Sequence, residues 1–151
     1  MKFVADSMLG KLAKWLRILG YDTHYQSYYR PGVMDQLLIE DRCLLSRYRE
    51  AVNQYKNTVL LNADRVGAQL DELREKIEDF SPDRSNWFSR CLACNTVLKE
   101  APRDEARDNV PEYVFYSNMS GIRWCPSRRR YYWPGSHRTR MVKQLEEWGF
   151  N

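Results

Sequence analysis

Two aspartates stand where apolar, strand-like runs of the sequence end. Asp6 directly follows Phe3-Val4-Ala5, and Asp64 closely follows Thr58-Val59-Leu60-Leu61. The ends of parallel strands meet at one edge of a sheet, so we expect these carboxylates to converge there. Clustered carboxylates repel one another and often hold a divalent cation, and Mg²⁺ or Mn²⁺ in such a site can activate water against a phosphodiester. The same aspartates could instead only cap helices.

Three cysteines have the spacing of a metal-binding module. Cys91 and Cys94 form a C-x-x-C pair, and Cys125 follows downstream. Zinc takes four ligands in a tetrahedron. The residues after Cys125 resemble the start of a second such pair, but the expected cysteine is Arg128, which leaves His137 as the candidate fourth ligand. A metal-free module and a Cys₃His zinc site both remain open at this stage.

The C-terminal part of the chain is basic and aromatic. Arg128, Arg129 and Arg130 directly precede Tyr131-Tyr132-Trp133. Residues 86–151 hold eleven Lys/Arg and seven Asp/Glu, whereas residues 1–85 hold thirteen of each, so the whole net charge of +4 lies in the C-terminal part. Arginines bind phosphates and aromatic rings stack on unpaired bases, which predicts RNA binding. The alternative is an aromatic core with arginines facing water.

The first half of the sequence alternates between strand-like and helix-like segments. We expect strands at 2–5, 21–25, 43–46 and 58–61, and helices at 9–19, 33–39, 47–55 and 66–77. This order predicts an α/β fold with a parallel sheet flanked by helices. We place this core at residues 1–80 and a smaller module at 86–151, with short strands at 114–116 and 131–133 and a helix at 136–149.

The first predicted helix has a polar face as well as an apolar one. Ser7 is expected to cap it, and Asp64 to cap the helix at 66–77. Lys11, Lys14 and Arg17 lie away from its leucine face and could meet phosphates. The 151 residues include no apolar run long enough to cross a bilayer and no signal peptide, which predicts a cytoplasmic protein without a membrane partner. In that compartment a C-x-x-C pair favours metal over disulfides.

In this order the motifs resemble the PIN-like RNase domain family that is named after the C-terminus of the Mut-seven exonuclease. The resemblance implies a PIN-like nuclease core, a C-terminal zinc ribbon and metal-dependent cleavage of RNA. Asp6 and Asp64 match acidic positions of the family, and the three cysteines match its zinc ligands. The stretches that carry the resemblance span nearly the whole chain and are 3–22, 42–47, 69–70, 90–95 and 132–137.

Three positions depart from the family pattern. After the strand at 43–46 the family has Thr-Arg-Asp, but this chain has Ser46-Arg47-Tyr48, so a metal-binding carboxylate is replaced by a phenol. The segment between residues 25 and 42 is compressed, and Asp35 is the best match there to the acidic residue of the second helix. Arg128 occupies a zinc-ligand position. Glu50 and His137 could substitute as ligands.

Three functions therefore compete. The first is a ribonuclease in which Asp6, Asp64 and Asp35 form the catalytic site and the basic module binds RNA. The second is a catalytically degraded RNA-binding module. The third is a protein-interaction domain whose basic surface meets an acidic partner, such as a ubiquitin-like protein.

Overall fold

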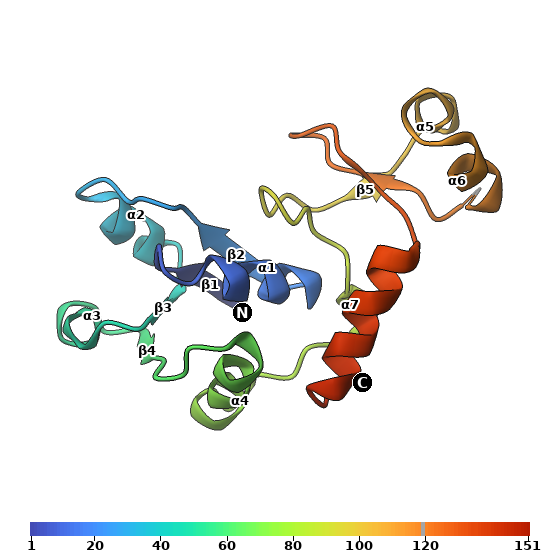
Figure 1. Cartoon of the computed structure of the whole chain (residues 1–151). Helices are drawn as coiled ribbons and strands as arrows, with labels where there is room; N and C mark the ends of the chain where they lie inside the picture. Colours follow the sequence, from blue (N-terminus) through green and yellow to red (C-terminus); the bar gives the residue numbers. More distant parts are fainter. Residues whose placement is uncertain (119) are drawn as a thin grey trace. The chain divides into compact units, whose positions relative to one another are not determined.

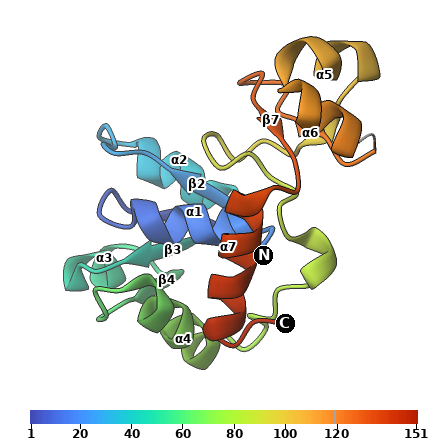
Figure 2. The same ribbon diagram turned by 45° about the vertical axis from the view of Figure 1, so that its right-hand side comes forward.

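The structure is a computed structural model that describes residues 1–118 and 120–151. The chain divides into two compact units, Met1–Phe88 and Ser89–Asn151, each of which is described by itself (Figures 1 and 2). Within the described residues, every helix is too short or too polar to span a membrane.

The first unit is a four-stranded parallel sheet with helices between its strands, which confirms the predicted α/β class. Its strands are β1 (Lys2–Ala5), β2 (Asp22–Tyr25), β3 (Cys43–Ser46) and β4 (Thr58–Leu60). Its helices are α1 (Gly10–Ile18), α2 (Val33–Ile39), α3 (Arg49–Gln54) and α4 (Val66–Lys76). The spatial order of the strands is β2-β1-β3-β4, so β4 forms one outer edge.

The helices cover both faces of this sheet. Val4 and Leu44 are register partners in β1 and β3, and both pack against side chains of α2 and α3. Successive strand residues point to opposite faces. Phe3 therefore lies on the other face, where its ring meets those of Tyr21 and Phe80. Helices α1 and α4 pack against each other.

The strand order creates a switch point between β1 and β3. The chain leaves β1 for β2 on one side, then returns past β1 to form β3 and β4 on the other side. In open parallel sheets, ligands bind beyond the carboxyl ends of the strands at such a point. We therefore expect a ligand-binding site at the residues that directly follow β1 and β3.

The segment after α4 belongs to this first unit. Trp87 is buried, and Phe80 stacks on Tyr21 with ring centroids 5.1 Å apart. Gly20 lies just after α1 and has a φ of +95°. A Cβ at this position would lie 2.5 Å from the carbonyl oxygen of Asn86. Only glycine allows this backbone approach.

In the second unit, the described residues form a small antiparallel sheet and three helices. Its strands, in the order β5-β6-β7, are β5 (Lys99–Glu100), β6 (Arg123–Trp124) and β7 (Tyr131–Tyr132). Its helices are α5 (Arg103–Asn109), α6 (Glu112–Ser117) and α7 (Ser136–Glu147). A core cluster consists of Ala106, Val110, Val114, Phe115 and Ile122.

One predicted strand of this unit is wrong. Residues 114–116 belong to α6, which begins directly after Pro111. Val114 and Phe115 are buried in the core cluster, while Tyr116 is exposed. A three-residue apolar run cannot distinguish a strand from the buried side of a short helix. The predicted strand at 131–133 is confirmed as β7, and the predicted helix at 136–149 as α7.

Candidate active site and cysteine cluster

The Asp6 carboxylate bridges the carboxyl ends of β1 and β3. Its side chain is buried, with the residue 8 % exposed. Oδ2 accepts hydrogen bonds from Ser46 Oγ at 2.6 Å and from the Arg47 backbone N at 3.3 Å, and Oδ1 accepts one from Met8 N at 2.9 Å. Hydrogen bonds to a charged acceptor are the stronger kind, so these donors fix the orientation of the Asp6 side chain. The predicted catalytic aspartate thus lies at the switch point.

The protein does not use every lone-pair position of the Asp6 carboxylate. A carboxylate has about four lone-pair positions, and three are used by the protein. Mg²⁺ usually keeps several waters and is held by only one or two carboxylates together with substrate phosphates. The arrangement around Asp6 fits a cation of that kind, with Asp6 as one ligand.

Asp64 lies in an exposed bend after β4, at the same edge of the sheet. Residues just before it are fastened to α4. Glu72 accepts hydrogen bonds from the backbone N of Asn62 at 3.0 Å and of Ala63 at 2.6 Å, and a further bond from Lys76 Nζ at 2.8 Å. In the sheet, β3 lies between β1, which precedes Asp6, and β4, which precedes Asp64.

The predicted helix caps at Ser7 and Asp64 are both wrong. Helix α4 has Arg65 at its N-cap, and no side chain caps it. Helix α1 begins only at Gly10, with Leu9 at the N-cap and again no side-chain bond. Just before α1, Asp6 accepts two hydrogen bonds from the backbone. Its side chain accepts one from Met8 N, and its carbonyl accepts one from Leu9 N at 3.0 Å.

Asp35 is not brought to Asp6. It is exposed in the first turn of α2 and lines a hollow of about 330 Å³ together with Tyr55 and Asn57. Asn57 directly precedes β4, so this hollow lies toward the amino ends of the strands, whereas Asp6 lies at the carboxyl ends. Because the segment between β2 and β3 is compressed, the position of an acidic residue in it is difficult to predict from the sequence.

Tyr48 is the second of the two residues between β3 and α3 and lies directly before α3. It is the N-cap residue of α3 with extended backbone, its side chain does not cap the helix, and the residue is 51 % exposed. Its backbone N donates to Ser46 Oγ at 3.0 Å. The position at which the family has an acidic residue is therefore one residue beyond the Arg47 that bonds Asp6.

Two tyrosines donate hydrogen bonds to backbone carbonyls at and just after the carboxyl end of β1. The Tyr29 hydroxyl donates to the carbonyl of Ala5 at 2.6 Å, and burial raises the pKa of Tyr29 to about 12, so it stays a neutral donor. The Tyr25 hydroxyl donates to the carbonyl of Ser7 at 3.0 Å. A Cβ at Gly10 would lie 2.8 Å from that hydroxyl, which explains the glycine at the start of α1.

The three predicted phosphate-binding residues of α1 have different environments. Lys11 and Lys14 are exposed, as expected. Arg17 is buried at 5 % exposure, and its Nε donates to the carbonyl of Thr23 at 2.9 Å. Its predicted position on a solvent-facing surface is wrong, because its guanidinium joins α1 to β2 instead.

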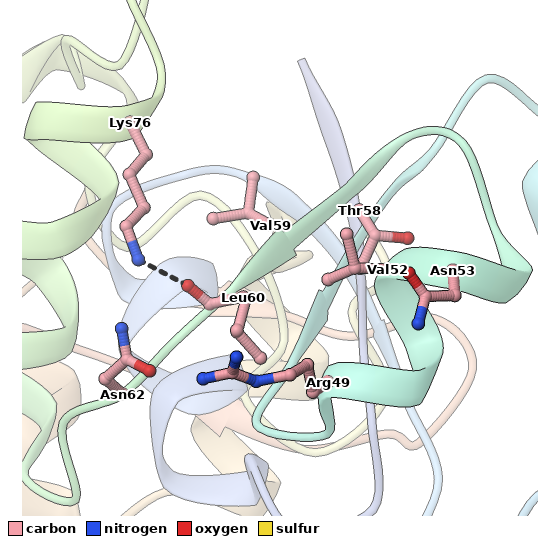
Figure 3. Close-up of a pocket in the computed structure, with 8 residues that line it drawn as sticks. All are labelled: Arg49, Val52, Asn53, Thr58, Val59, Leu60, Asn62 and Lys76. Carbon is pink, nitrogen blue, oxygen red and sulfur yellow. Dashed lines mark hydrogen bonds between the residues drawn. The ribbon is translucent and has the colours of Figure 1, made fainter.

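A hollow of about 470 Å³ runs beside the outer strand β4 (Figure 3). The side chains of Arg49 and Lys76 lie on opposite sides of Leu60, and Lys76 Nζ donates to the Leu60 carbonyl at 2.5 Å. Arg49 and Asn62 follow the carboxyl ends of β3 and β4. The hollow therefore places cationic side chains next to the edge that carries Asp6 and Asp64.

In the second unit, the sulfur atoms of Cys91, Cys94 and Cys125 lie within 4.8 Å of one another. The Sγ atoms of Cys94 and Cys125 are 3.4 Å apart. Burial acts to raise the pKa of Cys94, but hydrogen bonding with Thr96 and with the neighbouring thiols lowers it to about 7. Thiolates are the form that binds metals, so this cluster can hold a metal such as zinc.

The two turns that carry these cysteines have the same backbone. In the first, Cys91 N donates to the carbonyl of residue 96 at 2.8 Å and the N of Asn95 to the Cys91 carbonyl at 2.9 Å. In the second, Cys125 N donates to the carbonyl of residue 130 at 2.9 Å and the N of Arg129 to the Cys125 carbonyl at 2.7 Å. Asn95 and Arg129 both have positive φ, 72° and 54°. Arg128 thus occupies the place that Cys94 has in the first turn.

The structure does not bring His137 into this cluster. Among residues 1–118 and 120–151, the three cysteines form the only group of three or more metal-ligating side chains whose ligand atoms are mutually this close. His137 is exposed in the first turn of α7. The predicted Cys₃His set is therefore corrected to three cysteines.

Arg128, Arg129 and Arg130 are all exposed in the turn between β6 and β7. Arg129 lines a hollow of about 310 Å³ together with Trp124 and Tyr131, whose rings stack with centroids 6.4 Å apart, and with Glu105 and Asn109. Both aromatic walls and hydrogen-bonding groups are thus present beside a cationic side chain.

Comparison with known proteins bears directly on the first unit and on the cysteine cluster. The family model of the Mut7-C RNAse domain matches residues 1–145. The chain belongs to the Mut7-C RNAse domain family. No match was found among curated proteins or among solved structures.

Sequence reasoning did not identify two residues that lie at or near this candidate site. Ser46 is 1 % exposed and makes the shortest bond to Asp6, and Arg49 lines the hollow beside β4. Ser46 follows the apolar run of β3 just as Asp6 follows that of β1, which is the one signal that could have paired them. Arg49 gave no such signal, because it is one arginine of a charged helix.

Proposed function

We propose that this chain is a ribonuclease that depends on a divalent cation and cleaves RNA at the carboxyl edge of the β2-β1-β3-β4 sheet. The observation that carries the proposal is the position of Asp6, a buried carboxylate at the switch point of a Mut7-C RNAse domain. Open parallel sheets bind their ligands at such points.

Asp6 and Asp64 would hold the cation, Mg²⁺ or Mn²⁺. When bound, the cation supplies charge neutralisation at the phosphate and activation of water. Ser46 and the Arg47 backbone fix the Asp6 carboxylate in one orientation. Glu72 holds the segment that precedes Asp64 against α4.

RNA binding would use cationic side chains in each unit. In the first unit, Lys11 and Lys14 are exposed and Arg49 borders the carboxyl edge. In the second unit, the hollow with Trp124 and Tyr131 offers aromatic rings for an unpaired base, beside the exposed arginines 128–130. Stacking on aromatic rings and phosphate contacts are the usual means of binding single-stranded RNA.

The test is cleavage of a mixed pool of single-stranded and structured RNA with Mg²⁺ or Mn²⁺, and with EDTA. We expect cleavage that EDTA abolishes and that Asp6→Asn lowers at least about 100-fold. Asp79→Asn, an exposed carboxylate elsewhere in the first unit, is the matched control and should cleave as the parent does. Cleavage that persists in Asp6→Asn or in EDTA would refute the proposal.

One observation favours a second candidate, an RNA-binding module without catalysis. Tyr48 stands at the turn after β3 where the family has a carboxylate, and a neutral phenol is a poor ligand for a hard cation. A parent protein that binds RNA without cutting it, combined with cleavage by Tyr48→Asp, would support this candidate over the ribonuclease.

A further inference from the structure

The second cysteine turn keeps the backbone of a metal-binding turn although its last ligand is missing. The paired hydrogen bonds and the positive φ of Asn95 and Arg129 make residue 128 equivalent to Cys94. The backbone N of Arg128 also donates to Cys125 Sγ at 3.3 Å, which holds the turn against the sulfur. Arg128 itself is exposed. The cluster therefore presents three thiolates to a metal that takes four ligands.

Nearby side chains are engaged in other contacts. Tyr132 Oη lies 3.1 Å from Cys91 Sγ and accepts a hydrogen bond from Leu92 N at 3.3 Å. Thr96 Oγ1 lies 3.2 Å from Cys94 Sγ and donates to Ser127 Oγ at 3.2 Å. These are neutral hydroxyls that contact the sulfurs, and neutral hydroxyls are weak ligands for a thiophilic metal compared with thiolates.

We propose that the metal held by Cys91, Cys94 and Cys125 has an exchangeable fourth position that binds an exogenous thiol as its thiolate. Zinc sites with three protein ligands keep their fourth position for an outside ligand, whereas structural sites fill it from the protein. A soft, sulfur-rich site favours a sulfur ligand. The thiol releases its proton to the buffer as it binds, and no electrons are transferred.

The charge around the cluster suits an anionic ligand. Three thiolates on a divalent ion leave one net negative charge, and a fourth thiolate adds another. The exposed arginines 128–130 belong to the same turn as Cys125, and the Arg128 N–H bonds its sulfur. These positive groups offset the added charge. The inference does not depend on the ribonuclease proposal, only on metal binding by the three cysteines.

Cobalt in place of zinc gives a direct readout. The full chain, reduced and handled without thiol or oxygen, is loaded with one Co²⁺, and the visible d–d bands and the near-ultraviolet sulfur-to-cobalt charge-transfer band are recorded. Adding 2-mercaptoethanol should raise the charge-transfer intensity by about one third, since three thiolates become four. Ethylene glycol, in which a hydroxyl replaces the thiol, should leave the spectrum unchanged.

Variants separate this proposal from its alternatives. Arg128→Cys should show the four-thiolate spectrum before any thiol is added and should not respond to it, whereas Arg128→Ser should respond as the parent does. His137→Ala and Tyr132→Phe should also keep the parent's response. The proposal is overturned if the parent binds no cobalt, if thiol changes nothing, if Arg128→Cys responds like the parent, or if His137→Ala alters the parent's cobalt spectrum before thiol is added. It is also overturned if Tyr132→Phe removes the response to thiol.

Discussion

The Ser46 hydroxyl donates a 2.6 Å hydrogen bond to Oδ2 of Asp6 and joins the ends of β1 and β3 at the switch point of the sheet. The same hydroxyl accepts a bond from Tyr48 N at 3.0 Å. One buried oxygen therefore fixes both the candidate catalytic carboxylate and the residue directly before α3.

Ser46→Ala should destabilise the protein and weaken RNA cleavage together. The substitution removes the shorter of the two hydrogen bonds to Asp6 Oδ2 and leaves the Tyr48 backbone N–H without its partner. Loss of a bond to a charged group costs about 1.5–3 kcal/mol. Urea unfolding measures the loss in free energy. Ser7→Ala is the matched control, because Ser7 is exposed and caps no helix, and it should change stability by less than about 0.5 kcal/mol. Equal losses in both variants would contradict the role given to Ser46.

Tyr48→Asp should add both a helix cap and a metal ligand. Tyr48 already has the extended backbone of an N-cap residue, so an aspartate there can bond the free N–H groups of α3 and stabilise the fold by about 1 kcal/mol. The new carboxylate should also make the rise in melting temperature on addition of Mg²⁺ larger than that of the parent, since a ligand that binds only the folded state stabilises it.

Tyr48→Asn distinguishes these two effects. Asparagine caps a helix as well as aspartate does but carries no charge. We expect Tyr48→Asn to share the gain in stability but to show only the Mg²⁺ response of the parent. If both variants respond to Mg²⁺ alike, the turn after β3 is not part of the cation site.

The sequence predicts the first unit well because its elements are defined locally. The helix at Val33–Ile39 and the strand at Cys43–Ser46 have the predicted bounds, since apolar periodicity and flanking charges mark both. The errors arise where tertiary contacts decide. Residues 114–116 form part of α6 because their apolar side chains are buried in a core made by other segments, and Arg17 is buried because a carbonyl of β2 lies within its reach.

The candidate site was only partly predictable for the same reason. Asp6 could be placed at the sheet edge from the residues before it, but its partner Ser46 is forty positions away and is adjacent only because β3 pairs with β1. By contrast, the sequence after Cys125 already predicts that Arg128 stands at a ligand position, and the matching backbone hydrogen bonds of the two turns support its equivalence to Cys94.

Arg17 and Lys14 should differ in what their removal changes. Arg17→Ala removes a buried guanidinium that bonds the Thr23 carbonyl, and should lower the free energy of unfolding by about 1.5–3 kcal/mol. Lys14→Ala should leave stability within about 0.5 kcal/mol. If Lys14 contacts a phosphate, its loss should reduce the slope of log affinity for single-stranded RNA against log salt by about 0.7. An unchanged slope would remove Lys14 from the RNA surface.

Glu72 should make the segment that carries Asp64 sensitive to acid. Partial burial acts to raise the pKa of Glu72, but the bonds from Lys76 and from the backbone N–H groups of Asn62 and Ala63 outweigh it and lower the pKa below 4.5. A carboxyl whose pKa is lower in the folded state stabilises the fold above its ordinary pKa, and the contribution is lost as the pH falls through the lowered value. For this partly exposed group we expect about 1 kcal/mol at pH 7.

The measurement is the free energy of unfolding of the parent and of Glu72→Gln across acid pH. The difference between them should be full at neutral pH and should shrink as the pH falls below about 4.5, because the parent's carboxylate then becomes protonated. Glu75→Gln, an exposed neighbour on α4, should follow the parent at every pH. A Glu72→Gln difference that stays constant from pH 7 to acid would show that the charge of Glu72 does not hold the segment, and the position of Asp64 would then have to depend on Gln69, whose Nε2 donates to the Ala63 carbonyl at 3.0 Å.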